Sequence, residues 1–278
     1  MPLMSALGSI TLNDGHLLPA IGFGTWRVTG DEATDEVRSA LEAGYRLIDT
    51  AASYGNEEEV GRAVTGSGVP REEIVVTSKL RGADQGYDAA LRGFERTLGA
   101  LGLDRLDLYL IHWPLPARDL YVESWKALVR LREEGAVRSV GVSNFTAAHL
   151  DRLIDETGVT PAVNQIELHP GLVQEEMRAA NAARGIVTES WGPLGRGKGL
   201  LDTPAVREVA AAHGVSPARA VLRWHHQLGV VPLPKSADPL RQRENLDIAG
   251  FTLSDEEMAR LGSLPQRRLG GDPDTHEE

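Results

Sequence analysis

Four side chains that can carry out acid–base chemistry follow apolar segments in the first half of the chain. Asp49 ends the segment 45–49, and Tyr54 stands in the loop just beyond it. Lys79 and His112 follow two later apolar segments in the same way. If these segments are neighbouring parallel strands, the four side chains meet at one edge of the sheet. The spacing therefore predicts a catalytic site.

These residue types together can deliver a proton to a carbonyl group, or remove one from an alcohol. A tyrosine is a weak acid near neutral pH, because its reference pKa is about 10. An adjacent Lys79 ammonium lowers the pKa of Tyr54, and Asp49 keeps that lysine charged and oriented. His112 can orient a carbonyl oxygen or share its proton. None of the four can donate a hydride, so we expect a cofactor to supply one.

Short strands alternate with helices along the chain, after a hairpin predicted around Asn13-Asp14-Gly15. The expected strands cover 20–23, 45–49, 74–79, 106–112, 139–143, 162–166, 186–190 and 230–233. The expected helices cover 31–43, 57–64, 87–101, 119–134, 146–157, 173–184, 204–212, 217–228 and 238–247. Eight strand–helix units predict a (β/α)8 TIM barrel that forms one domain over residues 1–278.

Two further segments follow the eighth unit. Ser254 and Glu257 form the Ser-x-x-Glu pattern of a capping box, which predicts one extra helix. The polar tail, residues 265–278, is rich in glycine, proline and charge, so we expect either a loop over the surface or a partly disordered segment. The glycine-rich segment 192–198 resembles the start of an ATP-binding loop, but Gly199 lacks the hydroxyl that would hold Mg²⁺.

Composition narrows the possible partners. The 278 residues carry a formal net charge of -11, which disfavours nucleic acid and anionic membranes. An anionic cofactor therefore needs a local basic patch. Cysteine is absent, and the His, Asp and Glu residues lack the spacing of metal ligands, so no metal site is expected. No leader is visible, nor an apolar run of the ~20 residues that span a bilayer, so we expect a cytoplasmic protein.

Three segments resemble signatures of the aldo-keto reductase family, and they occur in the family's order. They are 44–51 with Glu57, Val60 and Gly61; 140–145; and 234–236 with Arg241, Glu244 and Asn245. The segments 190–195 and 271–275 are most similar to bacterial members near the 2,5-diketo-gluconate reductases. The resemblance implies a monomer that reduces aldehydes or ketones with NADPH. Keto-sugar acids, dicarbonyls and small aldehydes remain open as substrates.

The resemblance also implies a role for individual residues. Tyr54 is expected to donate the proton, with Lys79 and Asp49 tuning it and His112 orienting the substrate carbonyl. Trp26 and Trp113 are expected to form walls of the substrate pocket. The expected cofactor contacts are Ser143, Asn144 and Gln165 for the nicotinamide carboxamide, Trp191 for its ring, Gly192, Leu194 and Arg196 for the pyrophosphate, Lys235, Ser236 and Arg241 for the 2′-phosphate, and Glu244 and Asn245 for the adenine.

Two residues depart from the family pattern. Arg196 stands where a neutral residue is common, and we expect it to add a pyrophosphate contact. Asp238 lies in the phosphate-binding segment, where a neutral residue is more usual, and we expect it to cap the next helix and to point away from the phosphate. Lys79 also leaves open a Schiff-base aldolase, since lysine at a barrel strand end is the usual nucleophile there. Its proximity to Asp49 argues against that alternative. A module that only binds a nicotinamide cofactor is the other alternative, although such a protein need not keep all four catalytic side chains.

Overall fold

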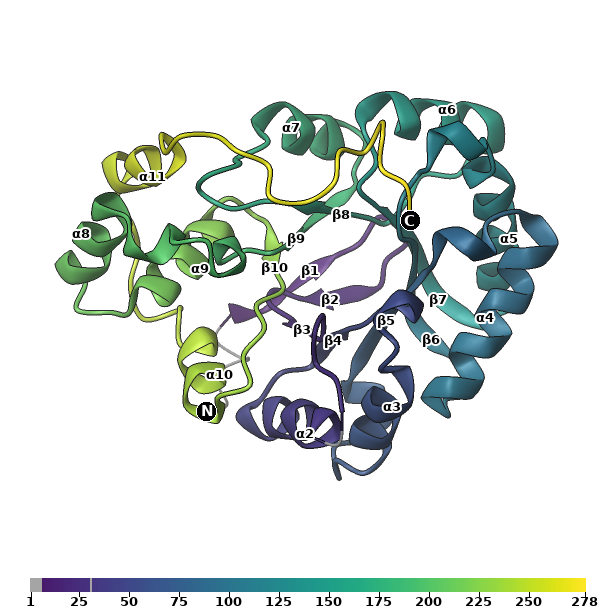
Figure 1. Cartoon of the computed structure of the whole chain (residues 1–278), viewed down its shortest axis with the longest axis horizontal. Coiled ribbons are helices and arrows are strands. Elements are labelled where there is room, and N and C mark those ends of the chain that lie inside the picture. Colours follow the sequence, from purple (N-terminus) through teal and green to yellow (C-terminus); the bar gives the residue numbers. More distant parts are fainter. Residues whose placement is uncertain (1–6, 31) are drawn as a thin grey trace.

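Eight parallel strands form the centre of the molecule, and helices surround them (Figure 1). The computed structural model describes residues 7–30 and 32–278. The strands are β3 (Phe23–Gly24), β4 (Leu47–Asp49), β5 (Val75–Leu80), β6 (Leu106–Ile111), β7 (Val137–Ser143), β8 (Val163–Glu167), β9 (Val187–Trp191) and β10 (Val231–Pro232), hydrogen-bonded in chain order. Hydrogen bonds from Gly22 N to Pro232 O (3.0 Å) and from Gly24 N to Pro234 O (3.1 Å) join the first strand to the last. The predicted (β/α)8 barrel is confirmed.

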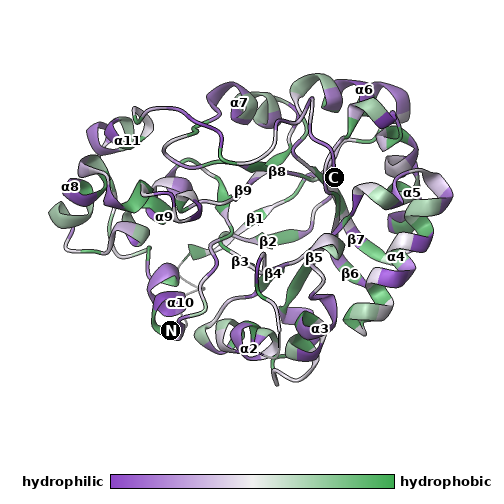
Figure 2. Cartoon of the chain, in the orientation of Figure 1, coloured by the Kyte–Doolittle hydropathy of each residue, from purple (hydrophilic) through white to green (hydrophobic). Residues whose placement is uncertain are grey.

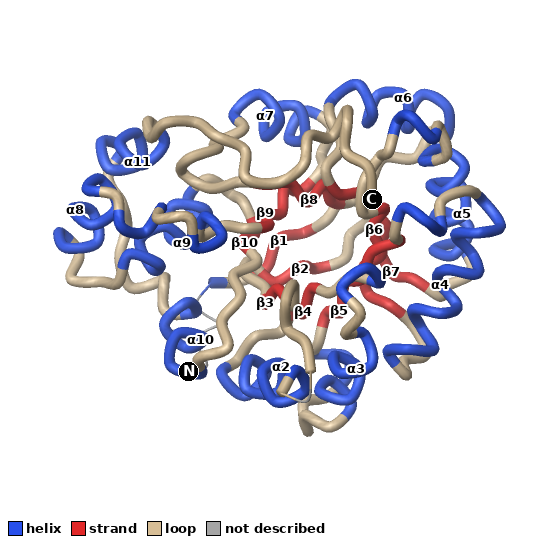
Figure 3. Tube along the Cα trace, in the orientation of Figure 1, coloured by secondary structure: helices blue, strands red, loops and turns tan. Residues whose placement is uncertain are grey.

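The helices form the outer layer of the barrel, as the tube view shows (Figure 3). They are α2 (Ala33–Ala43), α3 (Glu57–Thr65), α4 (Tyr87–Leu101), α5 (Tyr121–Glu133), α6 (Ala147–Thr157), α7 (Glu175–Ala183), α8 (Pro204–Ala212), α9 (Pro217–Gln227), α10 (Pro239–Leu246) and α11 (Asp255–Gly262). Every predicted helix is present to within about two residues. The expected start of the first one at Asp31 lies outside the described residues. The capping box of Ser254 and Glu257 at α11 is also confirmed.

Apolar residues fill two spaces, one inside the barrel and one between strands and helices. The central strands are largely hydrophobic, while the helices carry many hydrophilic residues (Figure 2). In α2, the predicted apolar face of Ala33, Val37, Ala40 and Leu41 is buried, and the helix ends at Gly44 with φ 115°. This left-handed conformation suits glycine, which has no Cβ.

The predicted hairpin is present and helps to close one end of the barrel. Strands β1 (Ser9–Thr11) and β2 (Leu17–Pro19) pair antiparallel, with Ile10 opposite Leu18. Leu18 is buried in a cluster with barrel-interior side chains such as Leu108 and Val163. The hairpin therefore leaves the opposite end of the barrel, where the strands terminate, as the accessible end.

The tail crosses that accessible end. Residues 265–278 contain no helix or strand and run from α11 over β8 and β9 (Figure 1, yellow). Glu167 at the end of β8 accepts hydrogen bonds from Leu269 N (2.7 Å) and Gly270 N (2.9 Å). The tail is thus a loop, one of the two expected forms, and it covers the mouth of the barrel. No helix in the described part of the chain has the length and hydropathy to cross a membrane.

Candidate active site

The four predicted acid–base residues lie together at the carboxyl ends of β4, β5 and β6. Asp49 ends β4, Lys79 lies in β5, His112 follows β6, and Tyr54 ends the short helix Ala52–Tyr54. These strands are parallel neighbours in the sheet. Lys79 Nζ is 2.7 Å from Asp49 Oδ2 and 3.4 Å from Tyr54 Oη, and it also donates to Thr50 O at 2.9 Å. The convergence expected from the strand pattern is therefore present.

The protonation states follow from burial and from the ion pair. Burial by itself lowers the pKa of Lys79, but Asp49 and Tyr54 outweigh it, and the pKa is raised. Burial raises the pKa of Tyr54 above its ordinary value, and the opposing effect of Lys79 is smaller. The expected lowering of the Tyr54 pKa is thus wrong for the net shift, although Lys79 acts in the expected direction. The result is a neutral phenol beside a charged ammonium.

His112 faces both the phenol and the tail. Its ring lies 5.8 Å from that of Tyr54, centroid to centroid, at an interplanar angle of 75°. His112 Nδ1 is 3.1 Å from Ser53 Oγ and 3.1 Å from Glu278 Oε1. Glu278 also accepts a hydrogen bond from Gly82 N at 2.7 Å. A carboxylate from the tail therefore lies beside the His112 imidazole.

The residues expected to hold the nicotinamide lie next to this group. Ser143 Oγ donates to Gln165 O at 2.8 Å, and Asn144 Nδ2 donates to His112 O at 3.0 Å. Asn144 has φ 64°, a left-handed conformation that asparagine tolerates better than most residues. Trp191 Nε1 donates to Asn144 Oδ1 at 2.8 Å. The Trp191 indole is thus hydrogen-bonded to one of the residues expected to bind the carboxamide.

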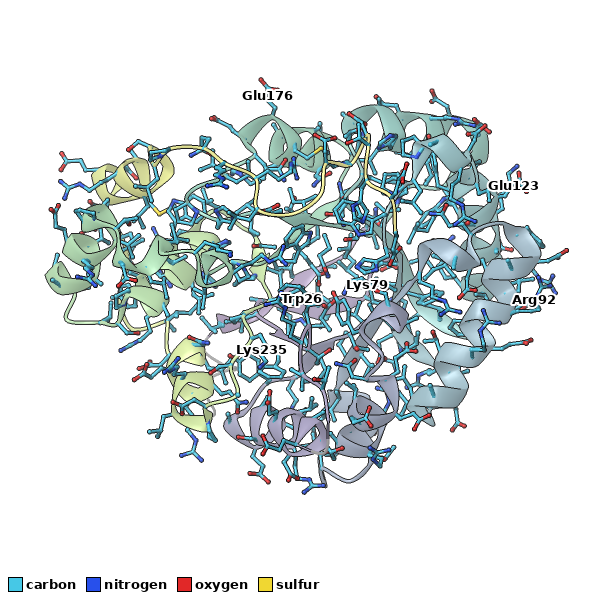
Figure 4. The ribbon with its side chains drawn as sticks, viewed as in Figure 1. Trp26, Lys79, Arg92, Glu123, Glu176 and Lys235 are labelled. Carbon is cyan, nitrogen blue, oxygen red and sulfur yellow. The ribbon has the colours of Figure 1, made fainter. Side chains whose placement is uncertain are left out.

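One cavity of about 580 Å³ connects most of the predicted site. Of the predicted residues, it is lined by Asp49, Tyr54, His112, Ser143, Asn144, Gln165, Trp191, Gly192, Leu194, Arg196, Lys235, Trp26 and Trp113. The predicted residues that do not line it are Lys79, Ser236, Arg241, Glu244 and Asn245. Trp26, Lys79 and Lys235 lie toward the middle of the view, whereas Arg92, Glu123 and Glu176 lie at the periphery (Figure 4).

The predicted phosphate-binding cations are paired with acids. Lys235 Nζ lies 3.3 Å from Glu36 Oε2, and Arg241 Nε lies 3.5 Å from Asp238 Oδ2. Asp238 caps α10 as expected, because its Oδ1 accepts from Leu240 N at 2.8 Å. Its other oxygen faces Arg241, so Asp238 also contacts one of the predicted phosphate-binding residues. An N-cap three residues before an arginine on the same helix turn is within reach of it.

The two residues expected near the adenine differ in environment. Glu244 is exposed on α10, whereas Asn245 is buried. On the same helix, Gln242 O accepts a hydrogen bond from the Tyr45 hydroxyl at 3.2 Å, which holds α10 against the barrel.

Aromatic and guanidinium groups bridge the mouth between two loops. The Arg196 guanidinium carbon lies 4.1 Å from the centroid of Trp26 and 5.7 Å from that of Trp191. Arg27 lies 4.2 Å from Trp26 on the same loop. A cation above an aromatic ring is attracted electrostatically to the face of that ring. Arg196 therefore links the loop after β3, which carries Trp26, to the loop after β9.

Several site residues were not identified from the sequence. Ser53, Arg27, His276 and Glu278 line the cavity, and the His276 ring lies 3.9 Å from that of Trp113. The sequence of the tail contains no periodic pattern from which its contact with the site could be predicted. Glu189 is another omission, and a signal for it existed, because it is an acid inside the predicted strand 186–190.

The fold and the site together define a class of (β/α)8 proteins with an Asp, Tyr, Lys and His group at the strand ends. Residues 20–265 match the model of the aldo/keto reductase family. This chain belongs to that family, as the sequence signatures indicated. It is an oxidoreductase by that membership.

Named relatives span almost the whole chain. The chain is 50% identical to 2,5-diketo-D-gluconic acid reductase B of Corynebacterium sp. (strain SHS752001), over 99% of this chain and 100% of that one. It is 47% identical to methylglyoxal reductase DkgA of Escherichia coli (strain K12), over 95% and 96% of the two chains. Among solved structures, it resembles a variant of Gox0644 in complex with NADPH, with a TM-score of 0.92, 45% identity, and coverage of 97% and 98%.

Proposed function

We propose that this protein reduces aldehydes or ketones to alcohols with NADPH, and that Tyr54 delivers the proton. The observation that carries the proposal is the position of Lys79, whose ammonium lies between Asp49 and the Tyr54 phenol at the base of the cavity. The names of the two relatives support keto-sugar acids and dicarbonyls such as methylglyoxal as substrate classes.

The residues around the cavity fit the cofactor. The NADPH complex of the similar Gox0644 structure supports NADPH as the partner here. The cavity joins the acid–base group to the loop of Gly192, Leu194 and Arg196 and to Lys235, which supplies basic groups to an otherwise acidic chain. Bound NADPH would supply the hydride. The nicotinamide carboxamide would be held by Ser143, Asn144 and Gln165, and Trp191 would stack on the nicotinamide ring. Ser236 and Arg241 would join Lys235 at the 2′-phosphate. Glu244 and Asn245 would lie at the adenine.

The protein's own groups supply the proton transfer. Tyr54 is neutral, since burial raises its pKa, and it can protonate a carbonyl oxygen. The adjacent Lys79 ammonium stabilises the phenolate that forms, and Asp49 keeps Lys79 charged and fixed. His112 orients the carbonyl oxygen, and Trp26 and Trp113 exclude water from its flank. A charged Lys79 is a poor nucleophile, so the Schiff-base alternative loses support.

The test replaces the proton donor and keeps its ring. Tyr54→Phe should lower kcat with methylglyoxal by on the order of 10²-fold or more, because a general acid contributes that much. The affinity for NADPH, measured by quenching of tryptophan fluorescence, should stay unchanged. Tyr87→Phe is the matched control, since Tyr87 lies on α4 and its hydroxyl contacts Arg130 at 3.5 Å.

The same experiment separates the alternatives. Unchanged turnover in Tyr54→Phe would remove Tyr54 from its proposed role. NADPH binding without turnover of any carbonyl compound by the wild-type protein would favour a cofactor-binding module. The monomeric state and the cytoplasmic location stay predictions from the sequence; sedimentation of the purified protein tests the first.

A further inference from the structure

A fully buried acid lies beneath the proposed cofactor site and has no role in the proton transfer described above. Glu189 in the middle of β9 has no solvent-exposed surface. It is the direct register partner of Gln165 on β8. Gln165 Nε2 donates a hydrogen bond to Glu189 Oε2 at 2.8 Å, and Glu189 Oε1 has no hydrogen-bond partner among residues 7–30 and 32–278. A buried carboxyl group in such a place needs an explanation, since an ionised one is costly without a partner.

Gln165 connects this acid to the catalytic group. The same Nε2 that donates to Glu189 also donates to Asp49 Oδ1, at 2.9 Å across the barrel interior. A carboxamide nitrogen has two hydrogens, and here each of them meets a carboxyl oxygen. The orientation of the Gln165 side chain is therefore determined, and its carbonyl oxygen is left for the cavity that Gln165 lines.

The charges of the cluster favour an uncharged Glu189 at neutral pH. Burial and then the nearby Asp49 raise the pKa of Glu189 to about 8, against the weaker effects of Gln165 and Lys79. The titratable groups that face it are Asp49 from β4 and Lys79 from β5, and these two already neutralise each other at 2.7 Å. Ionised Glu189 would add an unbalanced negative charge in the interior.

We infer that Glu189 is a positioning residue of the reductase site: as an uncharged acid it fixes the Gln165 amide, and through Gln165 it holds Asp49 and presents the Gln165 carbonyl oxygen to the nicotinamide. This inference rests on the proposed function, because it assigns Gln165 to the cofactor. The negative charge of ionised Glu189 partly cancels the positive electrostatic potential of Lys79, so that the ammonium stabilises the Tyr54 phenolate less. The rate of reduction should therefore fall as Glu189 ionises.

Three variants separate the charge of Glu189 from its position. Glu189→Gln keeps the acceptor and cannot ionise, so kcat at pH 6.5 should stay within about twofold of wild type. The fall of kcat with methylglyoxal above about pH 8 should be absent in this variant or shifted upward by at least about one pH unit.

Glu189→Asp keeps an acid but withdraws it from Gln165, and Glu189→Ala removes it. Both should lose about tenfold in kcat and in NADPH affinity, because a donor of Gln165 is left unsatisfied. Glu176→Gln, on the periphery of α7, is the matched control (Figure 4).

A second readout does not depend on catalysis. Because the folded-state pKa of Glu189 is raised from 4.5 to about 8, its contribution to stability is complete below pH 4.5 and is lost as pH rises through about 8. Denaturant unfolding should therefore show wild type losing stability relative to Glu189→Gln as pH rises from 4.5 to about 8.

The outcomes distinguish the two proposals. An unchanged pH profile of kcat in Glu189→Gln, with full activity in Glu189→Asp, would overturn the positioning role and leave the reductase function standing. If wild type turned over no carbonyl compound, the proposed function would fail, while the unfolding profile and NADPH affinity would still test the link from Glu189 to Gln165. If Glu189→Gln did not fold, Glu189→Asp would decide, since full activity there contradicts the role.

Discussion

At the scale of single residues, the protonation states of Lys79 and Tyr54 depend on burial and on the charges nearby. Lys79 has no exposed surface, and Asp49 at 2.7 Å together with Tyr54 keeps its pKa raised against the effect of burial. Tyr54 is partly buried at the cavity beside Lys79 and stays neutral, because the effect of burial on its pKa outweighs that of the nearby ammonium. The proposed proton donor should be protonated before the reaction and stabilised after it, and Tyr54 beside Lys79 meets both conditions. The predicted phosphate-binding residues Lys235 and Arg241 differ, because each is paired at the surface with an acid.

The pairing of Arg241 predicts how the chain distinguishes NADPH from NADH. The guanidinium is 74% exposed and free to turn from Asp238 toward a 2′-phosphate. Arg241→Ala should weaken NADPH binding about tenfold, equivalent to ~1.4 kcal/mol, and NADH binding by no more than about twofold. Asp238→Asn keeps the N-cap and removes the competing charge, so NADPH should bind more tightly. Tryptophan quenching measures both affinities.

The control for this experiment lies on the same helix. Arg243→Ala removes an exposed arginine of α10 and should leave both affinities unchanged. Equal losses of NADPH and NADH affinity in Arg241→Ala would contradict the 2′-phosphate assignment.

At the scale of elements, the tail completes a cavity that the strands begin. Its backbone is fixed by Glu167, and its side chains reach Trp113 and His112. Burial acts to raise the pKa of Glu278, but hydrogen bonding to His112, the His112 charge and the Gly82 amide together hold it below its ordinary value. A negative charge therefore stands beside the place where the carbonyl compound is expected to bind.

This charge predicts a preference among substrates. Glu278→Gln should lower KM for a carbonyl compound that carries a carboxylate by about tenfold, since it removes a like charge. The KM for uncharged methylglyoxal should change much less. Glu277→Gln removes the same charge from an exposed neighbour and serves as the control. A similar fall in KM for both kinds of substrate would mean that Glu278 acts by steric obstruction.

At the scale of the whole molecule, the outer core extends around much of the barrel. One buried cluster runs from Leu7 to Ile248 along the chain, and a second contains α8, α9 and α11 against β8. Partly buried Met177 and Leu194 contact both clusters. That residues 1–278 form one domain stays a prediction, and this continuity supports it.

One domain should unfold in one transition. A Cβ added at Gly61 in α3 would lie 2.0 Å from the carbonyl oxygen of Leu101, whereas one added at Gly99 in α4 would meet nothing within 4 Å. Gly61→Ala should therefore cost about 1–3 kcal/mol from overpacking, and Gly99→Ala should stabilise by up to ~1 kcal/mol. Calorimetry should show a single unfolding transition in both variants, and its midpoint temperature should shift as a whole with each substitution. The midpoint temperature should also rise when NADPH is added. A part of the transition that stays in place would indicate a second domain.

Much of this architecture was readable from the sequence alone. Apolar periodicity and glycine at helix ends determined the strands and helices, because these signals are local. Alternation of the two then restricted the topology, since parallel strands with helical crossovers have few arrangements. Asp49, Lys79 and His112 could be placed together for that reason, because strand ends of one barrel share one face.

Only the tertiary structure decided the contacts that join distant positions. Gln165 meets Asp49 across 116 residues of sequence, and Glu278 meets Gly82 across 196. Neither pairing leaves a local pattern, since each depends on barrel closure and on the path of an irregular segment. The net pKa of Tyr54 was mispredicted for the same reason: proximity to Lys79 could be inferred from strand ends, but the depth of burial that outweighs it is a property of the packed molecule.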